Sequence, residues 1–321
     1  MIAVVIPSYR ATRSILEVLA GLGPECDAIF VVDDACPDGT GKIVERECSD
    51  DRVQVLHHSE NQGVGGATMT GYQHALDEGA TVIVKIDADG QMDSSLIPEL
   101  LEPILTGRAD YVKGNRFFEP HDLKQMPAVR LIGNALLSFI TKFSSGYWDL
   151  FDPTNGFTAI HADVARRLPV KRISRRFFFE SDLLFRLNTL RAVVTDIAMP
   201  AQYGNEQSNL RAHRVVLEFL RKHIVNTAKR IFYNYFLRDF TIASVEIVLG
   251  TAMLGAGTLI GVLKWAESMR LGVPATAGTV MLAALPVLIG IQLLIAFLGH
   301  DMQNIPREPL QLRSRRRAKQ A

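Results

Sequence analysis

The stretch TVIVKIDADGQ, residues 81–91, decides the fold of this chain. Its β-branched run Thr81–Ile86 predicts a buried strand, and Gly90 lets the chain turn sharply after it. Asp87 and Asp89 stand at the end of that strand, where two neighbouring carboxylates repel each other unless a cation or hydrogen-bond donors offset their charge. The stretch therefore predicts a strand that ends in an acidic, ligand-binding loop.

A divalent cation is the simplest partner for this loop. Mg²⁺ and Mn²⁺ bind through one or two carboxylates, water and substrate phosphates, and such an ion acts as a Lewis acid on a departing diphosphate. Gln91 adds a neutral oxygen ligand, and the pair Asp33 and Asp34 ends another apolar run earlier in the chain. A lone Asp-x-Asp occurs often in surface turns, but this combination favours a metal and diphosphate site.

Outward from this loop, short apolar runs alternate with helix-length stretches, which is the pattern of a parallel sheet with right-handed crossovers. The expected strands are Ile2–Pro7, Ala28–Asp33, Val53–His57, Thr81–Ile86, Ala109–Lys113 and Val193–Ala198. We thus expect an α/β, Rossmann-like domain over residues 1–209, with its ligands outside the carboxyl ends of the strands. The run Gly63–Gly66 lacks the G-x-G-x-x-G spacing of a dinucleotide fingerprint and follows the third strand, which disfavours a dehydrogenase.

Charge is distributed unevenly along the 321 residues. Residues 1–210 carry a net charge of −8, whereas residues 211–239 carry +5 and residues 299–321 carry +4. The acidic front half argues against a general nucleic-acid binder, and the basic segments flank the most apolar part of the chain, as expected at a membrane surface. The three cysteines have no metal-ligand spacing and indicate reduced thiols in a cytosol-facing domain.

Two segments, residues 240–263 and 276–298, are long and apolar enough to cross a bilayer. The alternative is a pair of buried core helices, which is disfavoured by their length at the end of a complete α/β domain. The short connector predicts a transmembrane hairpin over residues 240–298, and the basic flanks place the front domain, the tail 299–321 and both termini in the cytoplasm. Glu246, inside the first span, is interpreted as an interfacial carboxylate.

Residues 210–239 precede the hairpin. Leu217, Leu220, Ile224, Ile231 and Phe232 recur at helical spacing with basic residues between them. This pattern predicts an amphipathic juxtamembrane helix that lies in the headgroup layer, rather than an ordinary surface helix, because it continues directly into a span.

Several motifs together resemble family 2 glycosyltransferases of the GT-A fold, in the branch that uses polyprenyl phosphates. They are Ile6–Tyr9, Val32–Asp34, the Asn61-x-Gly63-x-Gly65 run, Asp87–Gln91, Lys113–Arg116, Asn155–Phe157 and Phe179–Leu184. The branch includes dolichyl-phosphate mannose synthase and bacterial undecaprenyl-phosphate sugar transferases with a two-span tail. The resemblance covers residues 1–200 and the hairpin arrangement.

The resemblance implies a role for particular residues. Pro7, Tyr9, Asp34 and the segment Asp87, Ala88 and Asp89 would bind the nucleotide sugar, and Asp87, Asp89 and Gln91 would bind Mg²⁺ or Mn²⁺. Arg116 and Arg130 would bind the acceptor phosphate, for which a planar guanidinium is suited. Glu180 and Asp182 are candidate catalytic acids that position the sugar or an arginine, with capping and surface roles equally open. Departures at Ala11 and over Gln202–Asn209 leave the donor unassigned.

The resemblance implies inverting transfer of a sugar from a nucleotide sugar to undecaprenyl or dolichyl phosphate at the cytoplasmic membrane face. A phosphate monoester is already largely ionised at neutral pH, so no strong general base is required. Two alternatives stay open: an anchored transferase that acts on a glycan or a protein, and a non-catalytic nucleotide-sugar binding module. A polysaccharide synthase is disfavoured because the chain has few spans and lacks a Gln-x-x-Arg-Trp motif. The sequence leaves homo-oligomerisation open.

Overall fold

The computed structural model describes residues 1–117, 128–200 and 212–313. The chain forms two compact units. The sheet unit comprises Met1–Thr227 together with the described residues from Pro306 onward, and the hairpin unit comprises Ala228–Ile305. The segment Gln202–Asn209 lies outside the described residues.

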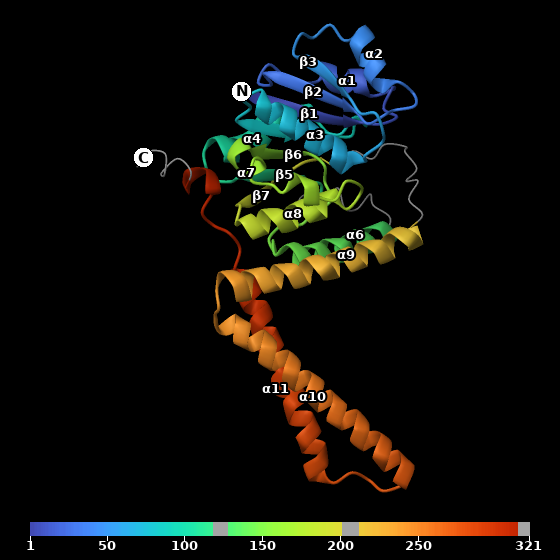
Figure 1. Cartoon of the computed structure of the whole chain (residues 1–321), viewed down its shortest axis with the longest axis vertical. Helices are drawn as coiled ribbons and strands as arrows, with labels where there is room; N and C mark the ends of the chain where they lie inside the picture. The colour runs from blue at the N-terminus through green and yellow to red at the C-terminus, as the bar shows by residue number, and fades with distance from the viewer. Residues whose placement is uncertain (118–127, 201–211, 314–321) are drawn as a thin grey trace. The chain divides into compact units, whose positions relative to one another are not determined.

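The sheet unit is built on a seven-stranded sheet of order β3-β2-β1-β4-β6-β5-β7 (Figure 1). Its strands are β1 (Ile2–Ser8), β2 (Ala28–Asp33), β3 (Val53–His57), β4 (Val82–Lys85), β5 (Tyr111–Asn115), β6 (Thr158–His161) and β7 (Val194–Ala198). Strands β1 to β4 pair in parallel, whereas β6 runs antiparallel to both β4 and β5. The predicted mostly parallel α/β domain is confirmed.

Helices cover this sheet and continue into the hairpin. They are α1 (Ile15–Ala20), α2 (Thr40–Glu47), α3 (Val64–Asp77), α4 (Ile97–Leu105), α6 (Ala128–Ser145), α7 (Ala162–Ala165), α8 (Phe179–Leu190), α9 (Ala212–Phe232), α10 (Ile242–Leu271) and α11 (Ala277–Gln303). Helix α3 packs across β1 and β2, and α4 packs against β5 and β6. The core between helices and sheet is fully buried and aliphatic, with Val4, Ile29, Val84 and Leu100 at its centre.

The expected strands occur where apolar runs predicted them, with one omission. Strand β6 was not predicted, because Thr158–His161 is only four residues long and runs directly into α7. It nevertheless occupies an interior position between β4 and β5. All three cysteines are free thiols, as expected.

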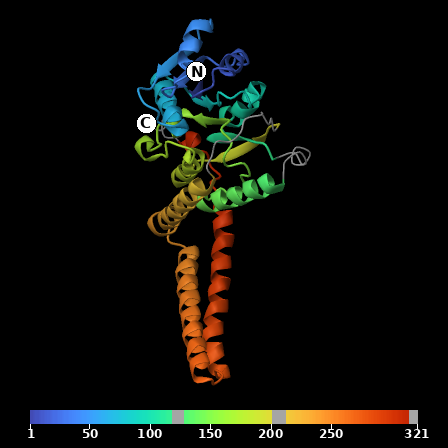
Figure 2. The ribbon, with the colours of Figure 1, turned by 90° about the vertical axis from the view of Figure 1, so that its right-hand side faces the viewer.

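The hairpin unit contains the end of α9, the segment that follows it, and the helices α10 and α11, which lie side by side in Figures 1 and 2. Both helices are long and apolar enough to cross a membrane. Small residues permit their contact: a Cβ on Gly290 would lie 2.6 Å from the backbone nitrogen of Leu254, and one on Gly257 would lie 2.8 Å from the carbonyl oxygen of Ala283. Glu246 on α10 is 9% exposed, and its Oε1 lies 3.5 Å from Nε2 of His300 on α11.

A buried ion pair closes the base of the hairpin unit. The guanidinium of Arg230 donates from Nη1 and Nη2 to the two carboxylate oxygens of Asp301, at 2.6 and 2.8 Å. Both side chains are only 2% exposed, and the Tyr235 hydroxyl donates to the same carboxylate at 2.8 Å. This cluster joins the segment before α10 to the end of α11.

After the hairpin, the chain returns to the sheet unit. The carboxylate of Asp110 accepts the backbone N–H groups of Leu310 and Gln311, at 2.8 and 3.1 Å. The Gln311 side-chain amide donates to the carbonyl oxygens of Ile104 and Ala109, at 3.0 and 2.7 Å. The part of the basic tail that the structure describes is therefore docked on the α4–β5 edge, a contact that the sequence did not predict.

Candidate active site

A cavity of about 550 Å³ opens at the carboxyl ends of β1, β2 and β4. The residues that line it include Pro7–Ala11 after β1, Asp34 after β2, Gly63, Val64 and Ala67 at the start of α3, and Asp87–Asp89 after β4. Arg10 and Ala35, in the loops after β1 and β2, have left-handed backbones, with φ of 58° and 51°. Such strain in non-glycine residues is typical of functional loops that their surroundings hold in place.

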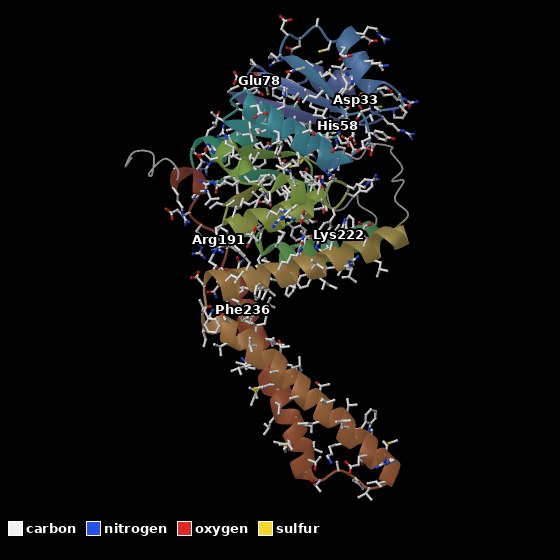
Figure 3. All side chains as sticks on the ribbon, in the orientation of Figure 1. Asp33, His58, Glu78, Arg191, Lys222 and Phe236 are labelled. Atoms are coloured by element: carbon white, nitrogen blue, oxygen red, sulfur yellow. The ribbon has the colours of Figure 1, made fainter. Side chains whose placement is uncertain are left out.

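Two carboxylates at the end of β2 hold the loops around the cavity, and one of them, Asp34, lines it. Asp34 accepts the backbone N–H groups of Gln62 and Gly63, both at 2.8 Å, and lies 2.8 Å from the Nδ1 atom of His58. Asp33 accepts the N–H groups of Cys36 and Gly41 and lies with His58 at one edge of the sheet (Figure 3). Asp34 therefore lines the cavity as expected and also holds the loop that leads into α3.

Asp87 in the acidic loop contacts the buried ammonium group of Lys85. Nζ of Lys85 lies 2.6 Å from Oδ1 of Asp87, 3.6 Å from Oε1 of Glu180 and 3.2 Å from the carbonyl oxygen of Gly156. Burial alone would lower the pKa of Lys85, but the two carboxylates reverse this and raise it above its usual value. Burial raises the pKa of Glu180, and Lys85 opposes that shift.

The remaining residues of the acidic loop are placed differently. Asp89 lines the cavity, and its Oδ1 accepts the backbone N–H of Gln91 at 3.0 Å. Gln91 does not line the cavity, so the structure brings together the two carboxylates of the predicted metal set but not its amide.

The side chains of Glu180 and Asp182 do not line the cavity. Asp182 accepts hydrogen bonds from the backbone of Ser174, from Nε of Arg186 and from the amide of Asn226. It thereby ties α8 to α9 and holds an arginine, whereas Glu180 contacts the cation below the acidic loop.

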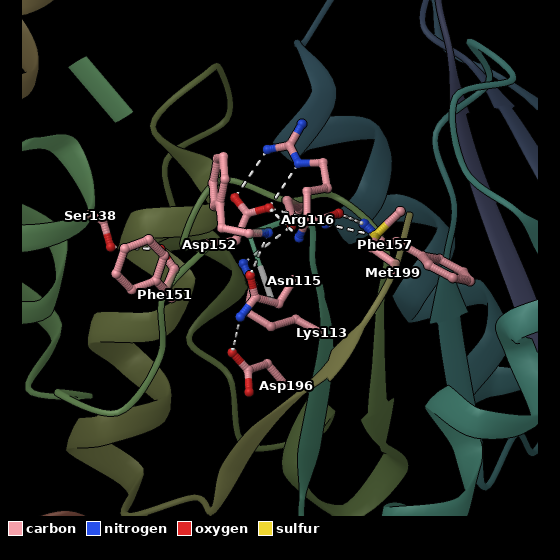
Figure 4. A network of polar contacts seen from close by, with 11 residues as sticks. Lys113, Asn115, Arg116, Ser138, Phe151, Asp152, Phe157, Asp196 and Met199 are labelled. Carbon is pink, nitrogen blue, oxygen red and sulfur yellow. Dashed lines mark hydrogen bonds and ion pairs between the residues drawn. The ribbon is translucent and has the colours of Figure 1, made fainter. Parts of the chain in front are cut away.

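Arg116 is held at the end of β5 by a buried carboxylate (Figure 4). Its Nε and Nη2 donate to Asp152 at 2.8 and 3.0 Å, and its backbone N–H donates to the same side chain. Lys113 lies beside this pair, and burial lowers its pKa to about 8. Arg130 lies in the first turn of α6.

Sequence reasoning missed two cavity residues, Arg176 and Phe177. They belong to the loop before α8, which approaches the start of α3 so closely that a Cβ on Gly65 would lie 2.5 Å from the Ser174 carbonyl oxygen. The N–H of Gly66 donates to the carbonyl oxygen of Arg175. The glycine run thus allows this loop to reach the cavity. In the sequence, the basic and aromatic residues directly before Phe179 could have indicated that this loop contributes to the site.

The residues present are compatible with a divalent cation supplied together with its substrate. The described residues contain no cluster of three or more His, Cys, Asp or Glu side chains that could hold a metal ion on its own. Two carboxylates in one cavity match the alternative arrangement, in which substrate phosphates and water complete the coordination shell.

The mixed sheet and its acidic cavity define a GT-A type glycosyltransferase domain, and residues 3–168 match the model of glycosyl transferase family 2. The chain therefore belongs to glycosyl transferase family 2.

Two curated relatives are similar over most of their length. The chain is 30% identical to a UDP-N-acetylglucosamine–dolichyl-phosphate N-acetylglucosaminyltransferase of Methanococcus voltae, over 68% of this chain and 92% of the relative. It is 34% identical to an undecaprenyl-phosphate mannosyltransferase of Micrococcus luteus, over 60% and 80%.

Among solved structures, glucosyl-3-phosphoglycerate synthase from Mycobacterium tuberculosis in complex with UDP has the same fold. The TM-score is 0.53 at 17% identity, covering 72% of this chain and 79% of that one. Another structure of that enzyme contains Mn²⁺ and UDP.

Proposed function

We propose that this chain transfers a sugar from a nucleotide sugar to a polyprenyl phosphate at the cytoplasmic face of a membrane. The observation that carries the proposal is the cavity at the ends of β1, β2 and β4, in which Asp87 and Asp89 face a chamber large enough for a ligand. The names of the two curated relatives support a polyprenyl-phosphate acceptor.

In this proposal, Pro7, Tyr9 and Asp34 bind the nucleoside, and the acidic loop faces the diphosphate. Arg176 lines the same cavity and supplies a positive charge for the diphosphate oxygens. Mg²⁺ or Mn²⁺ held by Asp87 and Asp89 would stabilise the departing diphosphate as a Lewis acid. These side chains hold the donor so that its anomeric carbon is open to attack.

The acceptor attacks with a phosphate oxygen. A new bond forms between that oxygen and the anomeric carbon, the bond from this carbon to the nucleoside diphosphate breaks, and the configuration inverts. The acceptor oxygen is already ionised at neutral pH, so the protein has to bring two anions together rather than remove a proton. Arg116 suits this task because Asp152 holds its guanidinium in one orientation.

The sheet unit carries an apolar surface suited to a bilayer. Helices α6 and α9 lie side by side (Figures 1 and 2), and the Ser144 hydroxyl on α6 lies 2.7 Å from Nδ1 of His223 on α9. Large apolar side chains are exposed on both helices: Leu136 and Phe139 on α6, and Val216, Leu217, Leu220 and Ile224 on α9. We infer that α6 joins the predicted juxtamembrane helix in contacting the headgroup layer.

Chain connectivity supports the proposed orientation. The chain leaves the sheet unit through α9 and is bound to it again at Leu310 and Gln311. A hairpin whose two outer ends are both attached to one folded domain has both ends on that domain's side of the bilayer. Exposed basic residues such as Arg221 and Arg313 on these flanks favour the cytoplasmic side.

A panel of nucleotide sugars, each incubated with the full chain, Mn²⁺ and one of three acceptors, tests the proposal. The acceptors are a short polyprenyl phosphate, the corresponding polyprenol and a soluble oligosaccharide. We expect one donor to yield a polyprenyl-phosphate sugar and no product from the other two acceptors. Transfer to the oligosaccharide alone would favour the anchored glycan transferase, and donor binding without any transfer would favour the binding module.

A further inference from the structure

A row of buried side chains crosses the sheet beneath the acidic loop. Thr158 on β6 is paired with Lys85 on β4 and with Lys113 on β5, so the three residues stand in register on neighbouring strands. Directly paired residues point to the same face of a sheet. Both lysines are almost fully buried, at 1% and 2% exposure, which is rare for this residue type without a partner.

The two lysines differ in what they contact. Lys85 lies within 4 Å of carboxylate oxygens on Asp87 and Glu180, and it donates to the carbonyl oxygen of Gly156. Lys113 donates to the carbonyl oxygen of Asn155 at 3.4 Å and forms no ion pair with any described residue. The charge of Lys85 is thus directed at the acidic loop, whereas that of Lys113 is not.

Gly156 fixes the geometry of the Lys85–Asp87 pair. A Cβ at this position would lie 2.2 Å from Oδ2 of Asp87 and 2.6 Å from Nζ of Lys85. A Cβ there would force the Asp87 carboxylate or the Lys85 ammonium to move, so the absence of a side chain at Gly156 leaves this pair in its observed place. Asp87 is consequently held at Oδ1 by Lys85, and its Oδ2 lies where a side chain at position 156 would otherwise stand.

We propose that Lys85 is a positioning residue for the donor site, which orients the Asp87 carboxylate before the cation and the diphosphate arrive. The inference rests on the proposed function, because it takes the cavity to be the site for a nucleotide diphosphate with its cation. Lys85 also offsets the repulsion between Asp87 and Glu180, which would otherwise drive the two carboxylates apart. A ligand held in advance in this way needs no reorganisation when the substrate binds.

Binding of Mn²⁺ together with UDP or GDP to the full chain tests this role without requiring transfer. Free Mn²⁺ is followed by electron paramagnetic resonance, and thermal unfolding of each variant is recorded in parallel. Lys85→Met is expected to weaken Mn²⁺–nucleotide binding by about 10- to 100-fold, the usual effect of removing a group that orients a metal ligand. Gly156→Ala, which keeps every charge but displaces the pair, is expected to act in the same direction.

Two matched variants separate positioning from general damage. Lys113→Met removes an equally buried lysine from the same row and should leave Mn²⁺–nucleotide affinity within about twofold of the wild type. Gly255→Ala adds a Cβ where nothing lies within 4 Å and should leave both affinity and transfer unchanged. If Lys85→Met does not fold, Gly156→Ala carries the test.

A double-mutant cycle with Asp87→Asn completes the test. If Lys85 acts through Asp87, Lys85→Met combined with Asp87→Asn binds Mn²⁺–nucleotide no more weakly than Asp87→Asn alone. Additive losses, or unchanged affinity in both Lys85→Met and Gly156→Ala, would overturn the proposal. Intact Mn²⁺–nucleotide binding without sugar transfer to lipid would contradict the proposed function alone, and no binding by the wild type would contradict both.

Discussion

Two ion pairs in the described part of the chain, Arg230–Asp301 and Lys85–Asp87, each join a buried cation to an aspartate but differ in how accessible that aspartate is. At the base of the hairpin unit, both carboxylate oxygens of Asp301 are taken by Arg230, a tyrosine hydroxyl adds a further bond, and neither charge is accessible. In the sheet unit, Lys85 is just as buried, but its partner Asp87 is 30% exposed and lines a cavity.

The difference separates structural from functional use of buried charge. A pair that is closed off from solvent and whose carboxylate is bound at both oxygens holds elements together, and breaking it leaves an uncompensated charge in the interior. A pair whose carboxylate still faces a cavity retains the capacity to bind a ligand, and the buried cation serves to hold that carboxylate ready. Removing the carboxylates of the acidic loop should therefore abolish sugar transfer and leave the fold intact. Removing one partner of the Arg230–Asp301 pair should instead destabilise the fold.

The largest effect is expected at Asp89. Asp89→Ala removes a cavity carboxylate and should lower the rate of sugar transfer by about 100-fold or more, since it removes charge that holds the diphosphate and its cation. The melting temperature should stay within 2–3 °C of the wild type, roughly the shift from a surface substitution. Transfer at the wild-type rate by Asp89→Ala would contradict the functional role of the acidic loop.

The structural role of the Arg230–Asp301 pair is tested by substituting Asp301. Asp301→Asn should destabilise the detergent-solubilised chain by about 3–5 kcal/mol, because it leaves the Arg230 charge buried without its counter-ion. The combined change of Arg230→Leu and Asp301→Leu, which removes both charges, should be much less harmful. Denaturant unfolding measures both variants, and equal stability of Asp301→Asn and the wild type would show that the pair does not hold the hairpin.

His223 lies between α6, α8 and α9 and is buried without an ionic partner in the described part of the chain. It therefore shows what burial does to a titratable group when no opposite charge compensates for it. Burial lowers its pKa from 6.5 to about 4. The unfolded chain therefore takes up a proton at this histidine below pH 6.5, whereas the folded chain does so only near pH 4, and acid favours unfolding.

Between pH 7 and pH 5 the His223 titration should cost about 2 kcal/mol of stability. His223→Asn cannot bind this proton, so its melting temperature should fall less between pH 7 and pH 5 than that of the wild type. An identical fall in both proteins would show that His223 titrates normally in the folded chain.

A further effect is expected for a neutral buried group. Gln311→Ala removes the two hydrogen bonds to Ile104 and Ala109 that dock the tail on the sheet unit, and should cost about 1–3 kcal/mol. Gln311→Glu keeps the size of the side chain but loses its donors, and should be at least as harmful. Hydrogen exchange at residues 306–313 checks whether the tail is released, and full protection in Gln311→Ala would contradict this role.

The parts of the fold that follow from local pattern were predictable. The apolar runs of β1 to β4 and the polar residues after them predict a cavity at this edge, because parallel strands end at one edge of a sheet. Strand β6 was missed, since its four residues run directly into α7 with no turn between them. Lys85 appeared only as a polar residue inside a strand, and its role depends on Glu180 and Gly156, which are far apart in sequence.

Long-range contacts explain the other omissions. Leu310 and Gln311 bind an aspartate 200 residues away, and no local signal in the basic tail indicates that contact. Arg176 and Phe177 enter the cavity because glycines at the start of α3 admit their loop, which only the folded chain reveals.

The most direct test of the account uses vesicles that contain undecaprenyl phosphate, the full chain and a radiolabelled nucleotide sugar, with Mn²⁺ or with a chelator. The account predicts that label moves into the organic-extractable lipid when Mn²⁺ is present, that chelation stops this transfer, and that Asp89→Ala abolishes it. Label that stays in the aqueous phase with every donor, or that reaches the lipid equally well in the presence of the chelator, would contradict it.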